Sequence, residues 1–382
     1  MNFFKLLCLF FIIYPFAGNA FIEGNKNSGV SDNQIKLGMS NALKGPAASL
    51  GVELKKGSEI YFNRVNKQGG IAGRKIKLLS YDDGYEPERT YQNTQKLVYD
   101  DNVFALFDYV GTPTSKAVMP IIHKEKVIYF TPFTGADFLR TPVVETIFNI
   151  RGSYFAEVDQ QVDYFVNKKK YTQVGLFIQA DDFGLAVTRG INYSLNQKNI
   201  TPIVNTRFKR NSKTIANAVS ALLRTNPQVI FCVGTYQPIA ELINKLRDKG
   251  YKGDFVSVSF VGVYELAQRL NSTKGVYVTG VVPSPYFSKL AIVKEYQQAM
   301  NNAGFTKFTH ESLEGYINAK VFVEIAKRCQ SKLTKQCFIH QAEQFSYDIG
   351  GLIISFTPNN HQGMKTIYWQ DLAIEFTKPY SP

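Results

Sequence analysis

The stretch VFALFDYVGTPTSKAVMPIIHKEKVIYF, residues 103–130, decides the fold class. Residues 103–107 and 127–130 are short apolar runs of the kind that form buried strands. Between them, a Gly- and Pro-containing turn at 110–115 leads into a helical pattern over 115–124. Two buried strands joined by a helix are typical of a parallel sheet covered by helices on its faces.

The same alternation extends in both directions along the chain. Upstream, strands are predicted at 35–39 and 75–81, and helices at 55–68 and 87–100. Downstream, the pattern restarts with a helix at 154–167. It continues with strands at 174–178, 202–208, 229–233, 255–258 and 275–282, and with helices at 184–197, 215–225 and 240–250. Helices at 290–303 and 312–328, and strands at 352–356 and 366–369, complete it. The sequence therefore predicts an α/β fold with two similar units in succession.

Length and composition agree with a two-domain globular protein. The chain has 382 residues and 45% hydrophobic residues, enough for two cores. The formal net charge is +13, but the lysines are scattered and no zinc-finger spacing accompanies them. We therefore expect no nucleic-acid partner. The four histidines are isolated from one another and from the cysteines, so neither a metal site nor a cofactor is expected.

The N-terminus has the pattern of a cleavable signal peptide covering residues 1–20. Lys5 precedes an almost wholly apolar run, 6–16, and Gly18-Asn19-Ala20 supplies small residues for cleavage. Cys8 lies before that position, so it does not indicate a lipoprotein. We expect export to the periplasm, a compartment that permits disulfides.

Three cysteines remain after residue 20. Cys329 and Cys337 enclose a polar stretch, and a disulfide closing a hairpin loop is one interpretation of this spacing. Cys232 lies within an apolar run and is interpreted as a buried, inert thiol.

Four motifs together resemble type I periplasmic binding proteins of ABC transporters, in the leucine/isoleucine/valine-binding branch. They are LKGPAA at 43–48, NKQGGIAGRK at 66–75, YDDGYEP at 81–87 and TPFTGA at 131–136. The resemblance runs from about residue 34 to 376. It implies two Rossmann-like lobes with parallel sheets around a ligand cleft, joined by a three-crossover hinge. Lobe 1 would comprise 30–152 and 284–347, and lobe 2 would comprise 153–283 and 348–382 with the hinge return.

The resemblance also implies a function. A monomeric protein of this kind captures a small polar or acidic ligand, such as an amino acid or related carboxylate, and delivers it to the permease subunits of an ABC importer. The alternative is a sensor of the same fold that reports to a membrane receptor or kinase. An enzyme is not expected, because no nucleophile elbow, P-loop or zinc motif is present.

Candidate ligand contacts lie in turns that follow predicted strands, where open parallel sheets bind ligands. By similarity, Thr112 matches a carboxylate-binding serine; the alternative is that Thr112 or Thr114 caps the following helix. Tyr109 precedes the same turn and belongs to the predicted set. The next turn adds Phe133, Thr134 and Gly135, where Gly135 stands in place of an expected threonine.

Two aromatic walls are predicted on lobe 2, and two positions depart from the family pattern. Phe183 and Tyr236 match the aromatic walls. Val261 lies near the position of a glutamate that pairs with the ammonium of amino-acid ligands, and Leu50 replaces an aromatic residue. Because a buried ammonium needs an anion, we expect a carboxylate without an α-amine to fit better than a standard amino acid. Glu265 is nearby but in a different register.

Overall fold

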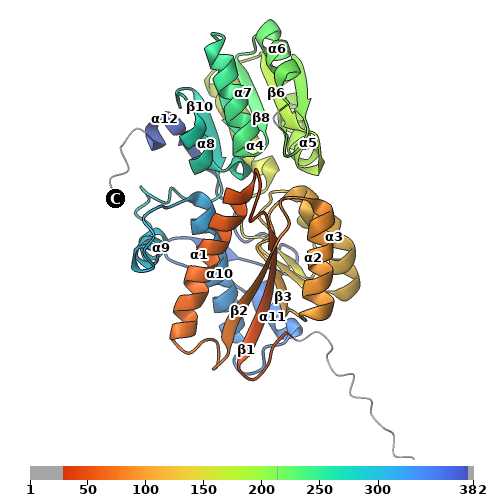
Figure 1. The fold of residues 1–382 in the computed structure, drawn as a ribbon, viewed down its shortest axis with the longest axis vertical. Helices are drawn as coiled ribbons and strands as arrows, with labels where there is room; N and C mark the ends of the chain where they lie inside the picture. Colours follow the sequence, from red (N-terminus) through yellow and green to blue (C-terminus); the bar gives the residue numbers. More distant parts are fainter. Residues whose placement is uncertain (1–28, 213, 377–382) are drawn as a thin grey trace, which may run out of the picture.

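The computed structural model describes residues 29–212 and 214–376 and consists of two α/β lobes stacked end to end (Figure 1). The predicted signal peptide, residues 1–20, lies outside the described residues. No helix of the described part is both long and apolar enough to cross a membrane.

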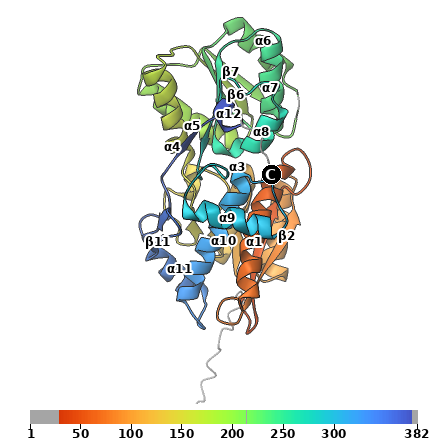
Figure 2. The same ribbon diagram turned by 90° about the vertical axis from the view of Figure 1, so that its left-hand side faces the viewer.

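Lobe 1 is built on a five-stranded parallel sheet in the order β2-β1-β3-β4-β5. Its strands are β1 (Gln34–Asn41), β2 (Lys75–Asp82), β3 (Ala105–Phe107), β4 (Ile128–Phe130) and β5 (Ile147–Phe148). One face carries α1 (Ala48–Lys67), α9 (Ala291–Asn302), α10 (His310–Arg328) and α11 (Lys335–Glu343). The other face carries α2 (Pro87–Gln95) and α3 (Thr112–Glu125). In Figure 2 the helices of the first group face the viewer.

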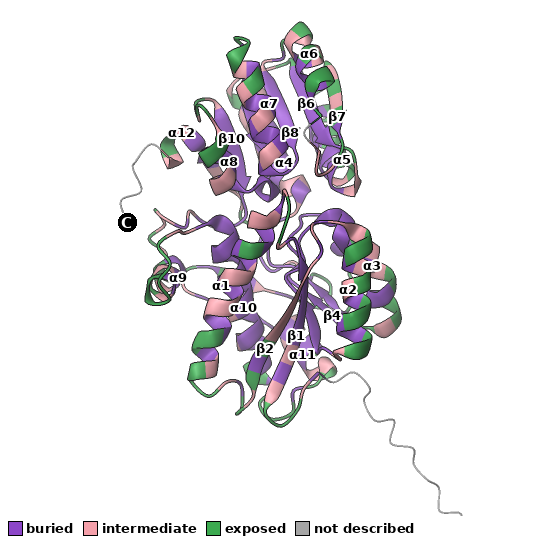
Figure 3. Cartoon of the chain, in the orientation of Figure 1, coloured by how far each residue is buried: buried purple, intermediate pink, exposed green. Residues whose placement is uncertain are grey.

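Lobe 2 is built on a six-stranded sheet in the order β13-β10-β9-β8-β6-β7. Its strands are β6 (Val174–Gln179), β7 (Val204–Phe208), β8 (Val229–Val233), β9 (Asp254–Ser257), β10 (Val276–Gly280) and β13 (Tyr368–Asp371). Only β13 runs antiparallel to its neighbour. The helices are α4 (Tyr154–Val162), α5 (Asp182–Asn196), α6 (Ala216–Thr225), α7 (Tyr236–Asp248), α8 (Val263–Arg269) and α12 (Leu372–Glu375). All five residues of the central strand β8 are buried, as expected for a parallel strand covered on both faces (Figure 3).

The chain passes between the lobes three times: after β5, after β10 and before β13. Residues 348–382 were predicted to belong to lobe 2, but the first half of this segment lies in lobe 1. Residues from Ile349 to Met364, including the short strand β12 (Ile353–Ser355), pack into the core of lobe 1. Their apolar side chains pack beside α9 and α10, and only β13 and α12 join lobe 2. The short strand β11 (Ser346–Asp348) pairs with β12.

Helices α1 and α10 lie side by side at van der Waals distance (Figure 1). Glycines make this contact possible: a Cβ at Gly57 would lie 1.8 Å from the Ser312 carbonyl oxygen, and one at Gly315 would lie 2.0 Å from that of Leu54. A larger residue at either position would push the helices apart. This contact fixes the start of α10 next to the interlobe region.

Cys329 and Cys337 form a disulfide with a Cα–Cα distance of 6.0 Å. The bridge joins the end of α10 to the first turn of α11 instead of closing a hairpin loop. Helix α11 was not predicted because its sequence, KQCFIHQAE, carries little apolar periodicity. Cys232 is a buried free thiol in β8.

Candidate functional site

The carboxyl ends of strands from both sheets face each other between the lobes, and the turns that follow them hold most of the predicted residues. In lobe 1, Thr112 begins α3 after β3, and Thr134 follows β4. In lobe 2, Phe183 lies at the start of α5 and Tyr236 at the start of α7. The structure thus brings turns from both lobes to one cleft, as expected for open parallel sheets.

Three buried hydroxyl groups form a chain, two of them from lobe 1 and the third from Tyr154 at the start of α4 in lobe 2. The Oγ1 atoms of Thr112 and Thr134 are 2.7 Å apart, and Thr134 Oγ1 donates to the Tyr154 hydroxyl at 3.3 Å. The capping alternative does not hold for Thr112, because the N-cap of α3 is Gly111. Thr114 Oγ1 instead donates to the carbonyls of Val110 and Gly111. The Thr112 hydroxyl therefore belongs to this hydroxyl chain and not to the cap of α3.

Gly135 has no room for a side chain. A Cβ there would lie 2.6 Å from the backbone nitrogen of Tyr154, which donates to the Gly135 carbonyl at 2.8 Å. A threonine at this position would displace the start of α4. The hydroxyl groups beside this position are those of Thr134 and Tyr154, which are hydrogen-bonded to each other.

Aromatic rings from both lobes fill the centre of the cleft around Phe260. Its ring centroid lies 4.7 Å from Phe183, 5.6 Å from Phe133 and 5.8 Å from Tyr85. All four side chains are buried. Phe260 was not predicted; its neighbour Val261 was, and Val261 is also buried, within the short 3-10 helix Ser259–Val261.

Tyr236 and Leu50 meet where the lobes touch. The Tyr236 hydroxyl accepts a hydrogen bond from the backbone N–H of Ser49 at 3.3 Å. Gly262 lies against both side chains, since a Cβ there would be 2.9 Å from the Tyr236 ring and 3.0 Å from Leu50. Burial raises the pKa of Tyr236, so its hydroxyl is neutral. Both predicted residues therefore lie at the lobe–lobe contact.

Tyr109 does not belong to this group. Its hydroxyl lies 3.0 Å from Thr94 Oγ1, and its ring packs edge-on against Tyr129 at 5.3 Å. These contacts place it in the core under α2 and α3. The prediction for Tyr109 is corrected accordingly: its side chain points to the opposite side of the strand end from the cleft.

A buried charged group adjoins the aromatic rings. The Arg151 guanidinium stacks on Phe133 at 4.2 Å, donates to Ser259 Oγ, and places Nε 3.4 Å from Glu314 Oε1. Its Nη1 has no hydrogen-bond partner. Glu157 accepts from the backbone N–H of Ser259 at 2.7 Å. Arg151 thus connects lobe 1, through Glu314, with lobe 2, through Ser259.

A small enclosed cavity lies beside this group. It is lined from lobe 1, lobe 2 and the crossovers by Phe133, Arg151, Ser259, Val263, Gly280, Val281, Val282, His310, Glu311 and Glu314. Burial raises the pKa of Glu311 and of Glu314 to about 7. Sequence reasoning missed these residues. Strand β5, which ends shortly before Arg151 at a lobe crossing, was itself not predicted.

Ion pairs close the rim of the cleft. Arg210 of lobe 2 pairs with Glu86 of lobe 1 at 2.7 Å and with Asp181 of its own lobe at 3.1 Å. On the other side, Lys307 of lobe 1 reaches Glu265 of lobe 2 at 3.1 Å. Glu265, the acid in the wrong register, is thus already engaged at the rim. The structure represents a closed arrangement of the lobes.

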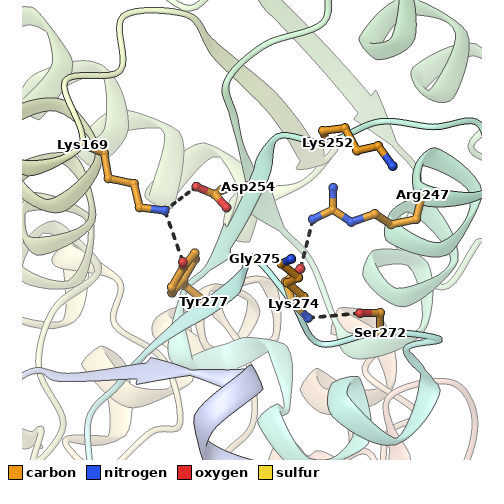
Figure 4. Close-up of a pocket in the computed structure, with 8 residues that line it drawn as sticks. All are labelled: Lys169, Arg247, Lys252, Asp254, Ser272, Lys274, Gly275 and Tyr277. Atoms are coloured by element: carbon orange, nitrogen blue, oxygen red, sulfur yellow. Dashed lines mark hydrogen bonds and ion pairs between the residues drawn. The ribbon is translucent and has the colours of Figure 1, made fainter.

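A second concave surface lies at the amino ends of β9 and β10, at the end of the lobe 2 sheet that faces away from lobe 1 (Figure 4). Two of its cations are held by neighbouring groups: Lys169 pairs with Asp254 at 2.7 Å, and Arg247 donates to the carbonyls of Tyr251 and Gly253. These contacts tie the loops at the amino ends of β9 and β10. Within residues 29–212 and 214–376, no group of three or more His, Cys, Asp or Glu is arranged to hold a metal ion.

Two α/β lobes, three crossings and a cleft lined from both sides define a two-lobed binding fold. Residues 34–373 match the family model described as "Periplasmic binding protein", and the chain belongs to this family. Its fold is that of the type I periplasmic binding proteins, as its solved neighbours show.

Individual relatives agree with this assignment. A solved structure from Rhodopirellula baltica, described as a possible leucine/isoleucine/valine-binding protein, is 32% identical with a TM-score of 0.84, covering 88% of this chain and 93% of that one. A substrate-binding periplasmic protein from Ralstonia solanacearum is 26% identical with a TM-score of 0.82, covering 88% and 97%. An "Amino acid binding protein" of Pseudomonas aeruginosa is 22% identical, covering 73% of this chain and 76% of that protein.

Proposed function

We propose that this protein is a periplasmic solute-binding protein that captures a small carboxylate or amino acid between its lobes and delivers it to an ABC importer. The observation that carries the proposal is the buried hydroxyl chain of Thr112, Thr134 and Tyr154. Thr112 and Thr134 follow the carboxyl ends of β3 and β4, and Tyr154 begins α4. Hydroxyl groups at such turns are suited to bind a carboxylate.

Lobe 2 supplies the other half of the proposed site. Phe183, Phe260 and Tyr236 provide apolar walls that exclude water when the lobes close. Leu50, Phe133, Gly135 and Val261 complete the proposed set. The relatives support this assignment, since those named above are described as binding proteins for amino acids or other substrates.

Ligand binding favours the closed arrangement because the ligand contacts both lobes only in that state. The rim contact between Arg210 and Glu86 adds to this preference. A permease that recognises the closed shape then receives only loaded protein. Export through the signal peptide at 1–20 places the protein where such a permease has its outer face.

A thermal-shift screen tests the proposal. The panel contains amino acids, hydroxy and keto acids, aromatic acids and short amides. A ligand present at 100 times its Kd stabilises the protein by about 2.7 kcal/mol. A panel in which no compound raises the melting temperature would contradict the proposal. Delivery is then measured as uptake of the radiolabelled ligand into proteoliposomes that contain the cognate permease and ATPase; uptake independent of this protein would contradict the transport role.

A further inference from the structure

We propose that Glu311 and Glu314, at the start of α10, form a subsite for a cationic nitrogen of the ligand. The inference rests on the proposed function and names a chemical feature of the ligand. The two residues are three apart, so their side chains lie on the same face of the helix. Both line the interlobe cavity together with Phe133, the residue before Thr134.

The two carboxylates are buried and short of partners. The exposed fraction is 4% for Glu311 and 3% for Glu314. Glu311 Oε1 has no hydrogen-bond partner, and the ion pair of Glu314 is with Arg151 Nε at 3.4 Å. Buried carboxylates are normally paired, so this arrangement indicates that a positively charged group completes the site.

The neighbouring basic side chains are held by other partners. Arg140, whose charge also acts on Glu314, donates to the carbonyls of Ala136 and Thr134. The Arg151 guanidinium is shared between Glu314 and Ser259. Burial lowers the pKa of His310 to about 3, so its ring is neutral, and it is hydrogen-bonded to Gln370 at 2.6 Å. Lys307 is engaged at the rim with Glu265 and Glu53.

Glu157 is the remaining acid beside the cavity, and its oxygens are occupied. Oε2 accepts from the Ser259 N–H and from Thr279 Oγ1, and Oε1 accepts from Ser259 Oγ. Glu311 and Glu314 are therefore the two acidic side chains that line the cavity, and Arg151 is the basic side chain that lines it. An ammonium that enters the cavity would meet both carboxyl groups, one of which, Glu311, has an oxygen without a hydrogen-bond partner.

This subsite revises the expectation that the ligand lacks an amine. That expectation rested on Val261, where the lobe 2 turn carries no acid. The structure places two acids on the opposite lobe, against the same interlobe cavity. A ligand with its carboxylate at Thr112 and Thr134 would direct its nitrogen past Phe133 toward α10.

Matched ligand pairs that differ only in the amine test this inference. Isothermal titration calorimetry compares leucine with 4-methylpentanoate, and 5-aminopentanoate with pentanoate. Leucine carries its amine on the α-carbon, and 5-aminopentanoate carries it at the far end of the chain. The pair with the stronger preference for its amine-bearing member therefore shows where on the ligand the nitrogen lies. We expect wild-type protein to bind the amine-bearing member of one pair at least tenfold more tightly. Members that bind within threefold of each other in both pairs would overturn the inference while leaving the proposed function intact.

Variants assign the preference to the two acids. In Glu311→Gln and in Glu314→Gln, the ratio of the affinities for the amine-bearing and amine-free members should fall below threefold. The affinity for the amine-free acid should be unchanged. Glu295→Gln, which removes a carboxylate paired with Lys320 outside the cavity, should keep the wild-type ratio. Equal weakening of both members in Glu311→Gln would count against the subsite. If Glu314→Gln does not fold, the affinity ratios of the wild-type protein and of Glu311→Gln still test the subsite. If no member of either pair binds and the wider panel also fails, the proposed function falls together with the subsite.

Discussion

Replacing Thr112 with valine removes one hydroxyl from the cleft and keeps the shape of the side chain. In the structure, Thr112 Oγ1 is buried and has one hydrogen-bond partner, Thr134 Oγ1 at 2.7 Å. Loss of that bond costs about 1 kcal/mol of stability. If the hydroxyl also donates to a ligand carboxylate, the variant loses a charge-assisted bond of about 1.5–3 kcal/mol. At about 1.4 kcal/mol per factor of ten, affinity falls roughly 10- to 150-fold.

Thr114 provides the matched control two residues away. Its hydroxyl is equally buried but donates to the carbonyls of Val110 and Gly111 within the same turn. Thr114→Val should therefore lose a similar amount of stability and keep its ligand affinity within threefold. Isothermal titration calorimetry with the tightest ligand of the panel, together with urea unfolding, separates the two effects. Equal losses of affinity in both variants, or unchanged affinity in Thr112→Val, would refute the assignment of Thr112 to the ligand.

Three further changes have defined outcomes. Cys337→Ser opens the disulfide and should lower the free energy of unfolding by roughly 2–3 kcal/mol, with no change in ligand affinity, as measured by urea unfolding and calorimetry. Burial raises the pKa of Asp83 to about 6, above its unfolded value near 3.9, so the folded state retains a proton that the unfolded chain releases. Stability should therefore fall by about 2 kcal/mol as the pH rises from 4 to 6. Asp83→Asn should remove this part of the pH profile, and an unchanged profile would show that Asp83 is not its cause. Arg210→Met breaks the rim contact with Glu86 and should speed ligand dissociation in stopped-flow experiments by about tenfold, whereas Arg64→Met, which breaks an ion pair inside lobe 1, should not.

The sequence was informative where the signal is local. Apolar runs alternating with helical segments predicted both sheets, because buried parallel strands and amphipathic helices each leave a pattern in a short window. Turns after strands led to Thr112, Thr134, Phe183 and Tyr236 for the same reason, and all four lie at the cleft. Tyr109 failed because a residue next to a turn can point to either side of the sheet, and the apolar pattern does not say which.

The buried charged group was beyond local reasoning. The group brings together Arg151, Ser259 and Glu314. More than 100 residues separate Arg151 from Ser259, and more than 50 separate Ser259 from Glu314. In the sequence, each of them resembles an ordinary surface residue. Phe260 is one residue from the predicted Val261, and only the turn of the 3-10 helix decides which of them reaches the centre. The segment 348–364 was misplaced because an apolar pattern indicates burial but not which of the two cores a segment joins; it packs in the core of lobe 1.

Reversible capture of a ligand between the two lobes can be measured by hydrogen–deuterium exchange with and without the tightest ligand of the panel. Capture should slow exchange in both halves of the cleft at once: residues 109–118 and 131–136 of lobe 1, and residues 181–187 and 257–263 of lobe 2. Residues 247–254 and 272–277, at the end of lobe 2 that faces away from lobe 1, should be unchanged. Protection confined to one lobe, or to that end of lobe 2, would contradict capture between the lobes.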